Sequence, residues 1–228
     1  MQDNTKIITV SGWAFPADAL IRLTSPIADY APPELDILAD RITSAPSPVV
    51  LIGWSMGAMT CLETAIKLKE KIASLILISG TGRFCYGPDY AHGTLREGLD
   101  TMIDGIYKKP RWTLEAFYKK SFMPKGYSPP ILNHLLKGAF AASQEKLADG
   151  LKYMREFDVR STLASLNMPV LLIHGNKDRI VPAGASEYLS RNIPNSRLQL
   201  IEDAGHAIPL THAENISDAI SSFLTHKT

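Results

Sequence analysis

The sequence predicts an α/β protein in which helices flank a mostly parallel sheet of about five or six strands, with a helical segment inserted into the chain. Two observations predict this class. Short apolar runs alternate with longer amphipathic segments over much of the 228 residues, as a parallel sheet covered on both faces requires. Between Ser79 and Met168 this alternation stops, and amphipathic segments follow one another without a β-branched run.

Five apolar runs are the expected strands, because each is short and bounded by residues that favour turns. A sixth run, IADY at 27–30, is a weaker candidate because Pro32 and Pro33 follow it closely. The five runs lie at 6–10, 48–54, 73–79, 169–175 and 196–202.

The helix expected at 56–70 shows the pattern from which the other helices are also predicted. Its apolar residues recur at helical spacing, and its charged residues fall on the opposite side. The apolar stripe consists of Met59, Leu62, Ala65 and Ile66. Further helices are expected at 16–24, 33–45, 183–193 and 213–225.

Residues 83–160 are expected to form a helical cap, inserted into a core made of residues 1–82 and 161–228. Within the cap, the breaks between helices are supplied by proline and glycine, as in KKP and MPKGYSPP. The cap helices are expected at 93–107, 113–122, 131–138 and 142–157.

The overall charge argues against nucleic acid and membrane surfaces as partners. The chain has 24 Lys and Arg against 23 Asp and Glu, a net charge of +1, so any charged partner must meet a local patch. No apolar stretch approaches the roughly 18 residues of a membrane span, and the start does not resemble a signal peptide. We therefore expect a cytoplasmic protein.

The cysteines and histidines give no sign of a metal or cofactor. Only Cys61 and Cys85 are present, without a CxxC pair, which predicts neither a disulfide framework nor a zinc site. The histidines form no metal-ligand pattern, and His174, at the end of an apolar run, is expected to be a satisfied core residue or one that supports the site residues from behind. We expect no metal and no cofactor.

The segment LIGWSMGAM contains the motif G-x-S-x-G between an apolar run and an expected helix. In this motif a strand turns directly into a helix, and the serine adopts a strained backbone geometry that exposes its hydroxyl. Glycines are needed on both sides because larger side chains would collide with the neighbouring backbone. Ser55 is therefore the candidate nucleophile.

A serine hydroxyl needs a base to remove its proton, and the base needs a carboxylate to orient it. Asp178 follows one expected strand in GNKDRIVP, and His206 follows the next in EDAGHAIP. The order Ser55, Asp178, His206 resembles that of the triad in α/β-hydrolases. Asp178 is preferred to Asp203, which lies nearer His206 in sequence, because the acid must approach from a neighbouring strand's loop.

The oxyanion formed during acyl transfer needs two backbone donors. The amide of Met56, directly after the nucleophile, is one candidate. Trp13, in the loop after the first expected strand, is the other. Ser11 stands in that loop where many enzymes with a similar triad order carry histidine. This difference leaves the donor in place, because the donor is a main-chain amide.

These motifs, SGW, GWSMG, GNKDRIVP and GHAIP, resemble those of the α/β-hydrolase superfamily in order and context, and the resemblance covers most of the chain. It implies an α/β-hydrolase fold whose sheet is trimmed here, because the leading hairpin usual in that fold is missing. It also implies an enzyme that works through an acyl-serine intermediate.

Within the superfamily, GW at 12–13 and 53–54, together with FDVRSTLASLNMPVLLIHGNKDRIVP, resembles the biotin-synthesis esterases that cleave the methyl ester of pimeloyl-acyl carrier protein. The resemblance implies a serine carboxylesterase with a carrier-bound ester substrate and acyl carrier protein as a partner. A short-chain carboxylesterase, a thioesterase and a lyase of menaquinone synthesis stay open as alternatives, as does a non-catalytic binding protein.

Acyl carrier protein is acidic, so a partner site should be basic. Residues 83–157 hold 12 Lys and Arg against 8 Asp and Glu, whereas the rest of the chain holds 12 against 15. The densest cations, expected either to dock the carrier or to form a solvated face, are Lys108, Lys109, Arg111, Lys119 and Lys120. Substrate contacts are expected from Trp54 and from three aromatics otherwise suited to the cap core, Phe117, Phe122 and Phe140.

Overall fold

A parallel sheet of six strands forms the centre of the protein in the computed structural model, which describes residues 6–20, 23, 28–31 and 34–225. The strands lie in the order β2-β1-β3-β4-β5-β6, and every neighbouring pair is parallel. Their bounds are Ile7–Val10 (β1), Ala28–Ala31 (β2), Val49–Trp54 (β3), Ile72–Ile78 (β4), Val170–Gly175 (β5) and Ser196–Ile201 (β6).

The sheet agrees with the strands expected from sequence. Each of the five apolar runs matches one strand to within one residue at either end, and the weak sixth candidate becomes β2, an edge strand paired with β1. The two prolines that weakened this candidate, Pro32 and Pro33, lie outside the described residues. All residues of β3 and β5 are buried, as strands in the middle of a covered parallel sheet should be.

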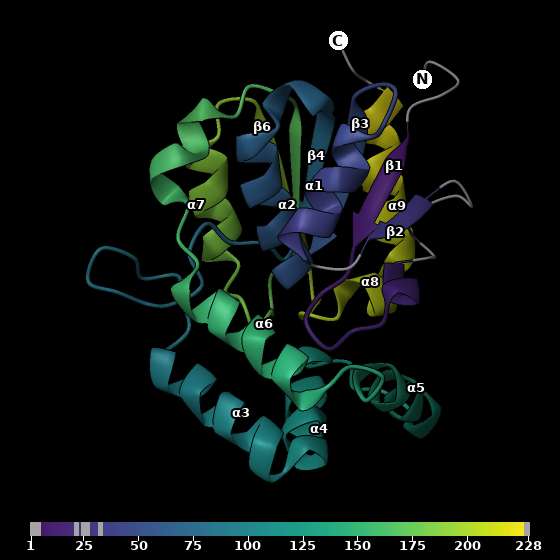
Figure 1. The fold of residues 1–228 in the computed structure, drawn as a ribbon, viewed down its shortest axis with the longest axis vertical. Coiled ribbons are helices and arrows are strands. Elements are labelled where there is room, and N and C mark those ends of the chain that lie inside the picture. Colours follow the sequence, from purple (N-terminus) through teal and green to yellow (C-terminus); the bar gives the residue numbers. More distant parts are fainter. Residues whose placement is uncertain (1–5, 21–22, 24–27, 32–33, 226–228) are drawn as a thin grey trace.

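Helices cover both faces of this sheet, as Figure 1 shows. Helices α1 and α2 lie on one face, α9 lies on the other, and α7 packs beside β5 and β6. The bounds of these helices are Leu35–Thr43 (α1), Met56–Lys67 (α2), Gly184–Asn192 (α7) and Ala213–Thr225 (α9). Short helical turns add Lys69–Lys71 (η2), Arg160–Ser165 (η3) and Ile208–Thr211 (α8).

The expectation of a helix over residues 16–24 is wrong in length. The structure has a 3-10 turn at Ala17–Leu20 (η1), and residues 21, 22 and 24 lie outside the described part. The chain has only a few residues here in which to turn and enter β2 alongside β1. A single turn that buries Ala19 and Leu20 meets this constraint better than a full helix.

Four helices lie between β4 and β5 in the chain and gather at one end of the sheet (Figure 1). We call them the cap helices: Arg96–Lys108 (α3), Pro110–Ser121 (α4), Pro129–Ala139 (α5) and Gln144–Glu156 (α6). Helix α3 packs on both α4 and α6. They occupy the regions where cap helices were expected, while the division of the chain into core and cap domains stays a prediction.

The two connections between the cap helices and the sheet run side by side. Arg83 and Asp158 form an isolated antiparallel bridge, and the Val159 amide donates to the Gly82 carbonyl at 2.8 Å. The Arg160 guanidinium forms ion pairs with Asp89 at 2.7 Å and with Asp158 at 2.9 Å. These contacts join the start and the end of the inserted helices.

The turn from β3 into α2 takes place at a single residue. Ser55 has φ 57° and ψ −121°, which few residues other than glycine adopt. A Cβ on Gly53 would lie 2.5 Å from the Gly57 carbonyl oxygen, and one on Gly57 would lie 2.5 Å from the Ser11 carbonyl oxygen. The glycines therefore let α2 begin pressed against β3 and the end of β1.

Among the described residues, no helix combines the length and the apolar character that crossing a membrane would need.

The close approach at Gly57 predicts a stability effect. Gly57→Ala should lower the free energy of unfolding by about 1–3 kcal/mol, because its methyl group must displace backbone rather than a side chain. Gly98→Ala in α3 is the control, since no atom beyond its chain neighbours and its own helix backbone lies within 4 Å of its added Cβ, and it should be neutral or stabilising by up to about 1 kcal/mol. Urea unfolding measures both; equal effects would contradict the packing described here.

Candidate active site

Ser55 lies at the carboxyl end of β3 and directly precedes α2. Its amide donates to the Ile78 carbonyl of β4 at 2.9 Å, and its carbonyl accepts the first bond of the helix from the Met59 amide. The residue is 5% exposed. Its position at the positive end of α2 favours negative charge next to the hydroxyl.

The Ser55 hydroxyl ends a chain of three hydrogen-bonded side chains. The His206 Nε2 lies 2.8 Å from the Ser55 Oγ, and the His206 Nδ1 lies 2.7 Å from the Asp178 Oδ2. The side chains of His206 and Asp178 are fully buried. The structure thus brings together all three residues proposed for catalysis from the sequence order, while their catalytic roles stay a prediction.

Asp203, the alternative acid, lies elsewhere. It is exposed at a left-handed backbone position with φ 53°, and its amide donates to the Asn176 side chain. The carboxylate that faces the His206 imidazole is therefore that of Asp178, from the loop after the neighbouring strand.

The loop that carries His206 is held from several sides. The Trp54 indole donates to the His206 carbonyl at 3.1 Å, and the Ala207 amide donates to the Ser121 carbonyl at the end of α4 at 2.9 Å. Gly205 fits closely against the Met123 carbonyl oxygen, where a side chain would collide with it. One loop is thus fixed by both the sheet and a cap helix.

Asp178 uses its two oxygens differently. Oδ1 accepts the amides of Ile180 and Val181 at 2.7 and 2.9 Å, which fixes the loop, and Oδ2 faces His206. Complete burial by itself raises the pKa of this carboxyl group, but interactions with His206 and His174 outweigh burial and hold the pKa well below its usual range. The group is therefore a carboxylate in the folded protein at neutral pH.

The two expected oxyanion donors belong to segments that lie next to the serine. Met56 is the first residue of α2, directly after Ser55. Gly12, just before Trp13, lies so near that its added Cβ would be 3.1 Å from the Ser55 Cβ. The Trp13 indole donates to the Leu147 carbonyl of α6 at 2.8 Å, so this loop is fixed to the cap helices. The assignment of the two amides as oxyanion donors stays a prediction.

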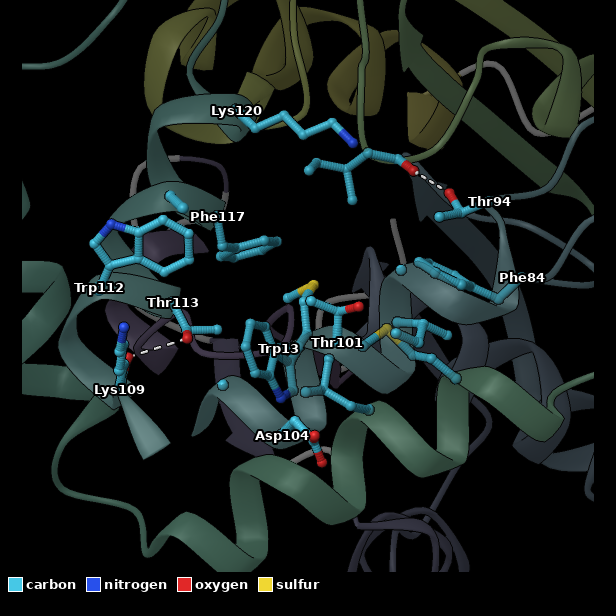
Figure 2. A pocket seen from close by; sticks show the side chains of 18 of the residues that line it. Trp13, Phe84, Thr94, Thr101, Asp104, Lys109, Trp112, Thr113, Phe117 and Lys120 are labelled. Carbon is cyan, nitrogen blue, oxygen red and sulfur yellow. Dashed lines mark hydrogen bonds between the residues drawn. The ribbon is translucent and has the colours of Figure 1, made fainter. Parts of the chain in front are cut away.

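A cavity of about 440 Å³ lies between Ser55 and the cap helices α3, α4 and α6. In Figure 2 the rings of Trp13, Phe84, Trp112 and Phe117 surround this space, and the Lys120 side chain extends along its edge. Leu99, Met102, Leu151, Met154 and Ile180 complete the apolar part of the lining. Such a cavity suits an apolar group attached to the reacting carbonyl.

Only one of the four aromatics expected to contact the substrate lines this cavity. Phe117 does so. The fully buried Trp54 packs on Phe15 with centroids 4.2 Å apart and supports the His206 loop instead. Phe122 packs on Tyr127, and Phe140 is 47% exposed. Sequence spacing does not reveal which side of a cap helix faces the cavity, so the lining residues Phe84 and Trp112 were missed.

The five expected docking cations are all exposed on α3, α4 and their junction. Lys108, Lys109 and Lys120 line the cavity. Lys108 pairs with Asp104 at 2.9 Å, and Arg111 pairs with Glu115 at 2.8 Å. No carboxylate of the described residues pairs with the other three, Lys109, Lys119 and Lys120.

Within the part of the chain that the structure describes, no three His, Cys, Asp or Glu side chains are grouped so that they could hold a metal ion. The arrangement at Ser55 can instead support nucleophilic attack assisted by an imidazole.

Residues 43–213 match the family model described as alpha/beta hydrolase fold. The chain belongs to the α/β-hydrolase fold family. A pimeloyl-[acyl-carrier protein] methyl ester esterase of Xanthomonas oryzae pv. oryzae is 30% identical over 199 residues, which are 86% of this chain and 78% of the relative. The esterase of the same name from Nitrosomonas europaea is 29% identical over 182 residues, covering 78% and 71%. The family and these relatives make the protein a hydrolase.

Solved structures agree on the fold. The esterase EaEST from Exiguobacterium antarcticum superposes with a TM-score of 0.87 over 99% of this chain and 93% of its own, at 21% identity. A bromoperoxidase from Bacillus anthracis gives 0.86 over 97% and 92%, also at 21% identity. Such similarity extends the α/β-hydrolase fold over the whole described chain.

The lowered pKa of Asp178 predicts how stability depends on pH. Because the pKa is lower in the folded than in the unfolded protein, the ionised carboxylate stabilises the fold above the unfolded pKa. This contribution is lost as the pH falls from about 4.5 toward the folded pKa. In Asp178→Asn the free energy of unfolding should therefore decrease less steeply than in the wild-type protein as the pH falls from about 5 to about 3.

Urea unfolding at several pH values measures this slope. Asp203→Asn is the matched control, since it removes an exposed carboxylate from the adjacent loop, and it should keep the wild-type slope. A wild-type slope in Asp178→Asn would contradict the assignment.

Proposed function

We propose that the protein is a serine carboxylesterase that hydrolyses the methyl ester of pimeloyl-acyl carrier protein through an acyl-enzyme. The observation that carries the proposal is the hydrogen-bonded chain Ser55–His206–Asp178 at the floor of an apolar cavity whose lining includes lysines. The relatives named as esterases of this substrate support it. A cytoplasmic location, expected from the sequence, belongs to the same proposal.

Acylation begins when the Ser55 Oγ attacks the ester carbonyl and His206 Nε2 accepts the hydroxyl proton. Asp178 holds the imidazole through Nδ1 and stabilises the positive charge that forms on it. The amides of Trp13 and Met56 are the proposed donors to the oxyanion. When the tetrahedral intermediate collapses, the C–O bond to the methoxy group breaks, and the His206 proton passes to the leaving oxygen to give methanol.

Deacylation follows the same steps, with water as the nucleophile in place of the serine hydroxyl. His206 removes a proton from water, the hydroxide adds to the acyl carbonyl, and Ser55 leaves with the proton returned by His206. The products are the original serine and a carboxylic acid, which releases its proton to solvent at neutral pH.

The lining of the cavity fits one orientation of such a substrate. With the methyl ester at Ser55, the methylene chain contacts Trp13, Phe117 and the other apolar residues, while the thioester and the carrier remain outside. The exposed lysines Lys109 and Lys120 then lie next to the acidic carrier. This orientation explains how a thioester could survive beside a reactive serine.

Ser55→Ala should abolish labelling by a fluorophosphonate and lower kcat/KM for p-nitrophenyl butyrate by about 10⁴-fold or more, because the nucleophile is lost. Ser79→Ala is a suitable control, because Ser79 is another buried serine with positive φ, directly after the neighbouring strand. The Ser79→Ala protein keeps Ser55 and should still be labelled. Labelling that persists in Ser55→Ala would exclude the acyl-enzyme mechanism.

The specific substrate is tested by expressing the protein in a bacterium that lacks its pimeloyl-carrier esterase, on medium without biotin. Growth is expected with the wild-type protein and not with Ser55→Ala. Activity on short p-nitrophenyl esters without restored growth would leave the esterase and reject this substrate. Cleavage of the thioester instead of the methyl ester would indicate a thioesterase.

Reversing charge at the cavity should affect only a carrier-bound substrate. Replacing Lys109, Lys119 and Lys120 with Glu should raise KM for the carrier-bound ester about tenfold, with kcat/KM for p-nitrophenyl butyrate little changed. The control replaces Lys67, Lys69 and Lys71 with Glu. These lysines lie just before β4 begins, at the edge of the sheet opposite to the one that carries Ser55. Steady-state kinetics at low salt measures both; equal losses on both substrates would contradict docking.

A further inference from the structure

His174 is a second imidazole in contact with the carboxylate of Asp178. It lies on β5, four residues before Asp178, and its side chain is fully buried. Its Nε2 is 3.3 Å from the Asp178 Oδ2 and 2.9 Å from the Val181 carbonyl oxygen. Its Nδ1 is 2.6 Å from the Ser186 Oγ at the start of α7. The sequence left two interpretations of this position, a satisfied core residue or a residue that supports the site residues from behind.

The partners of the ring determine where its hydrogen lies. A backbone carbonyl and a carboxylate can only accept, so the Nε2 of His174 carries a hydrogen and donates. The Ser186 hydroxyl is much nearer to Nδ1 than to its other acceptor, the Gly80 carbonyl at 3.4 Å. Ser186 therefore holds the Nδ1 side of the ring, opposite the Nε2–H that faces the Val181 carbonyl and Asp178.

The Asp178 Oδ2 consequently faces the His206 Nδ1 at 2.7 Å and the His174 Nε2–H at 3.3 Å, while the shorter bond of that N–H goes to the Val181 carbonyl at 2.9 Å. We propose that His174 is a positioning residue for the reaction: its Nε2–H keeps Oδ2 directed at His206 and limits how much negative charge that oxygen presents to His206. The inference rests on the proposed function, because it concerns the same triad. His174 is not among the residues that line the cavity.

The other charged groups near Asp178 do not compete for Oδ2. Lys177 and Arg179, its neighbours in the chain, are exposed and share a surface hollow with Asp203 from the loop after β6. The Oδ1 atom is occupied by two backbone amides. Among the described residues, the side chains that contact Oδ2 are therefore His206 and His174.

Loss of the His174 donor should change the pH profile in a definite direction. With one donor fewer, Oδ2 presents more negative charge to His206 and stabilises its protonated form. Because only neutral His206 can accept the serine proton, the midpoint of the acid limb of kcat/KM should then move to higher pH, by about half a unit or more.

The experiment compares His174→Phe with His174→Gln on p-nitrophenyl butyrate between about pH 5 and pH 9. Phe keeps a ring but has no donor, whereas the Gln amide can supply an N–H near the position of Nε2. We expect the upward shift in His174→Phe, with kcat lowered and KM little changed, and a midpoint close to wild type in His174→Gln. Ser186→Ala, which frees the ring without touching Asp178, should give a smaller shift in the same direction.

A purely structural His174 would lower the melting temperature and the activity at every pH without moving the midpoint, and that result overturns the proposal. If His174→Phe does not fold, ¹⁵N-histidine NMR of the wild-type protein decides instead: a hydrogen on Nδ1 of His174 rather than Nε2 would overturn it. An inactive wild-type protein that fluorophosphonates do not label would reject the proposed function, whereas an active one with unshifted variants rejects only the role of His174.

Discussion

The turn at Ser55 is the constraint on which the rest of the site depends. A strand ends and a helix begins at one residue with φ 57°, and this places the hydroxyl beyond the edge of the sheet. The backbone strain is tolerated because Gly53 and Gly57 allow α2 to press against β3 and the end of β1. Every other loop of the site is arranged around this fixed point.

The cap helices are joined to the same loops that complete the site. The Tyr118 hydroxyl of α4 donates to the Ala14 carbonyl at 2.5 Å, and the Trp13 indole donates to a carbonyl of α6. The end of α4 also accepts the Ala207 amide, next to His206. The cavity and the proposed catalytic groups therefore share their supports, so a change in cap packing is expected to reach both.

Burial sets the electrostatics of the site. A carboxylate removed from water is costly unless it is well paired, and Asp178 has two backbone amides on one oxygen and two imidazoles facing the other. The lysines beside the cavity are in the opposite situation, since they are exposed and screened by salt. The buried charge next to the serine is thus fully paired, whereas the charge beside the cavity is open to solvent and, under the proposed function, to a carrier protein.

The sequence by itself determined the parallel sheet, most helices and the three proposed catalytic residues. Strand periodicity and the order of the loops after β3, β5 and β6 are local patterns, and parallel strands bring their carboxyl ends to one edge. Only the tertiary structure decided which aromatics line the cavity, which lysines lack a paired carboxylate, and that His174 contacts Asp178. These depend on how helices rotate and pack against distant segments, which the spacing of residues along one helix or strand does not specify.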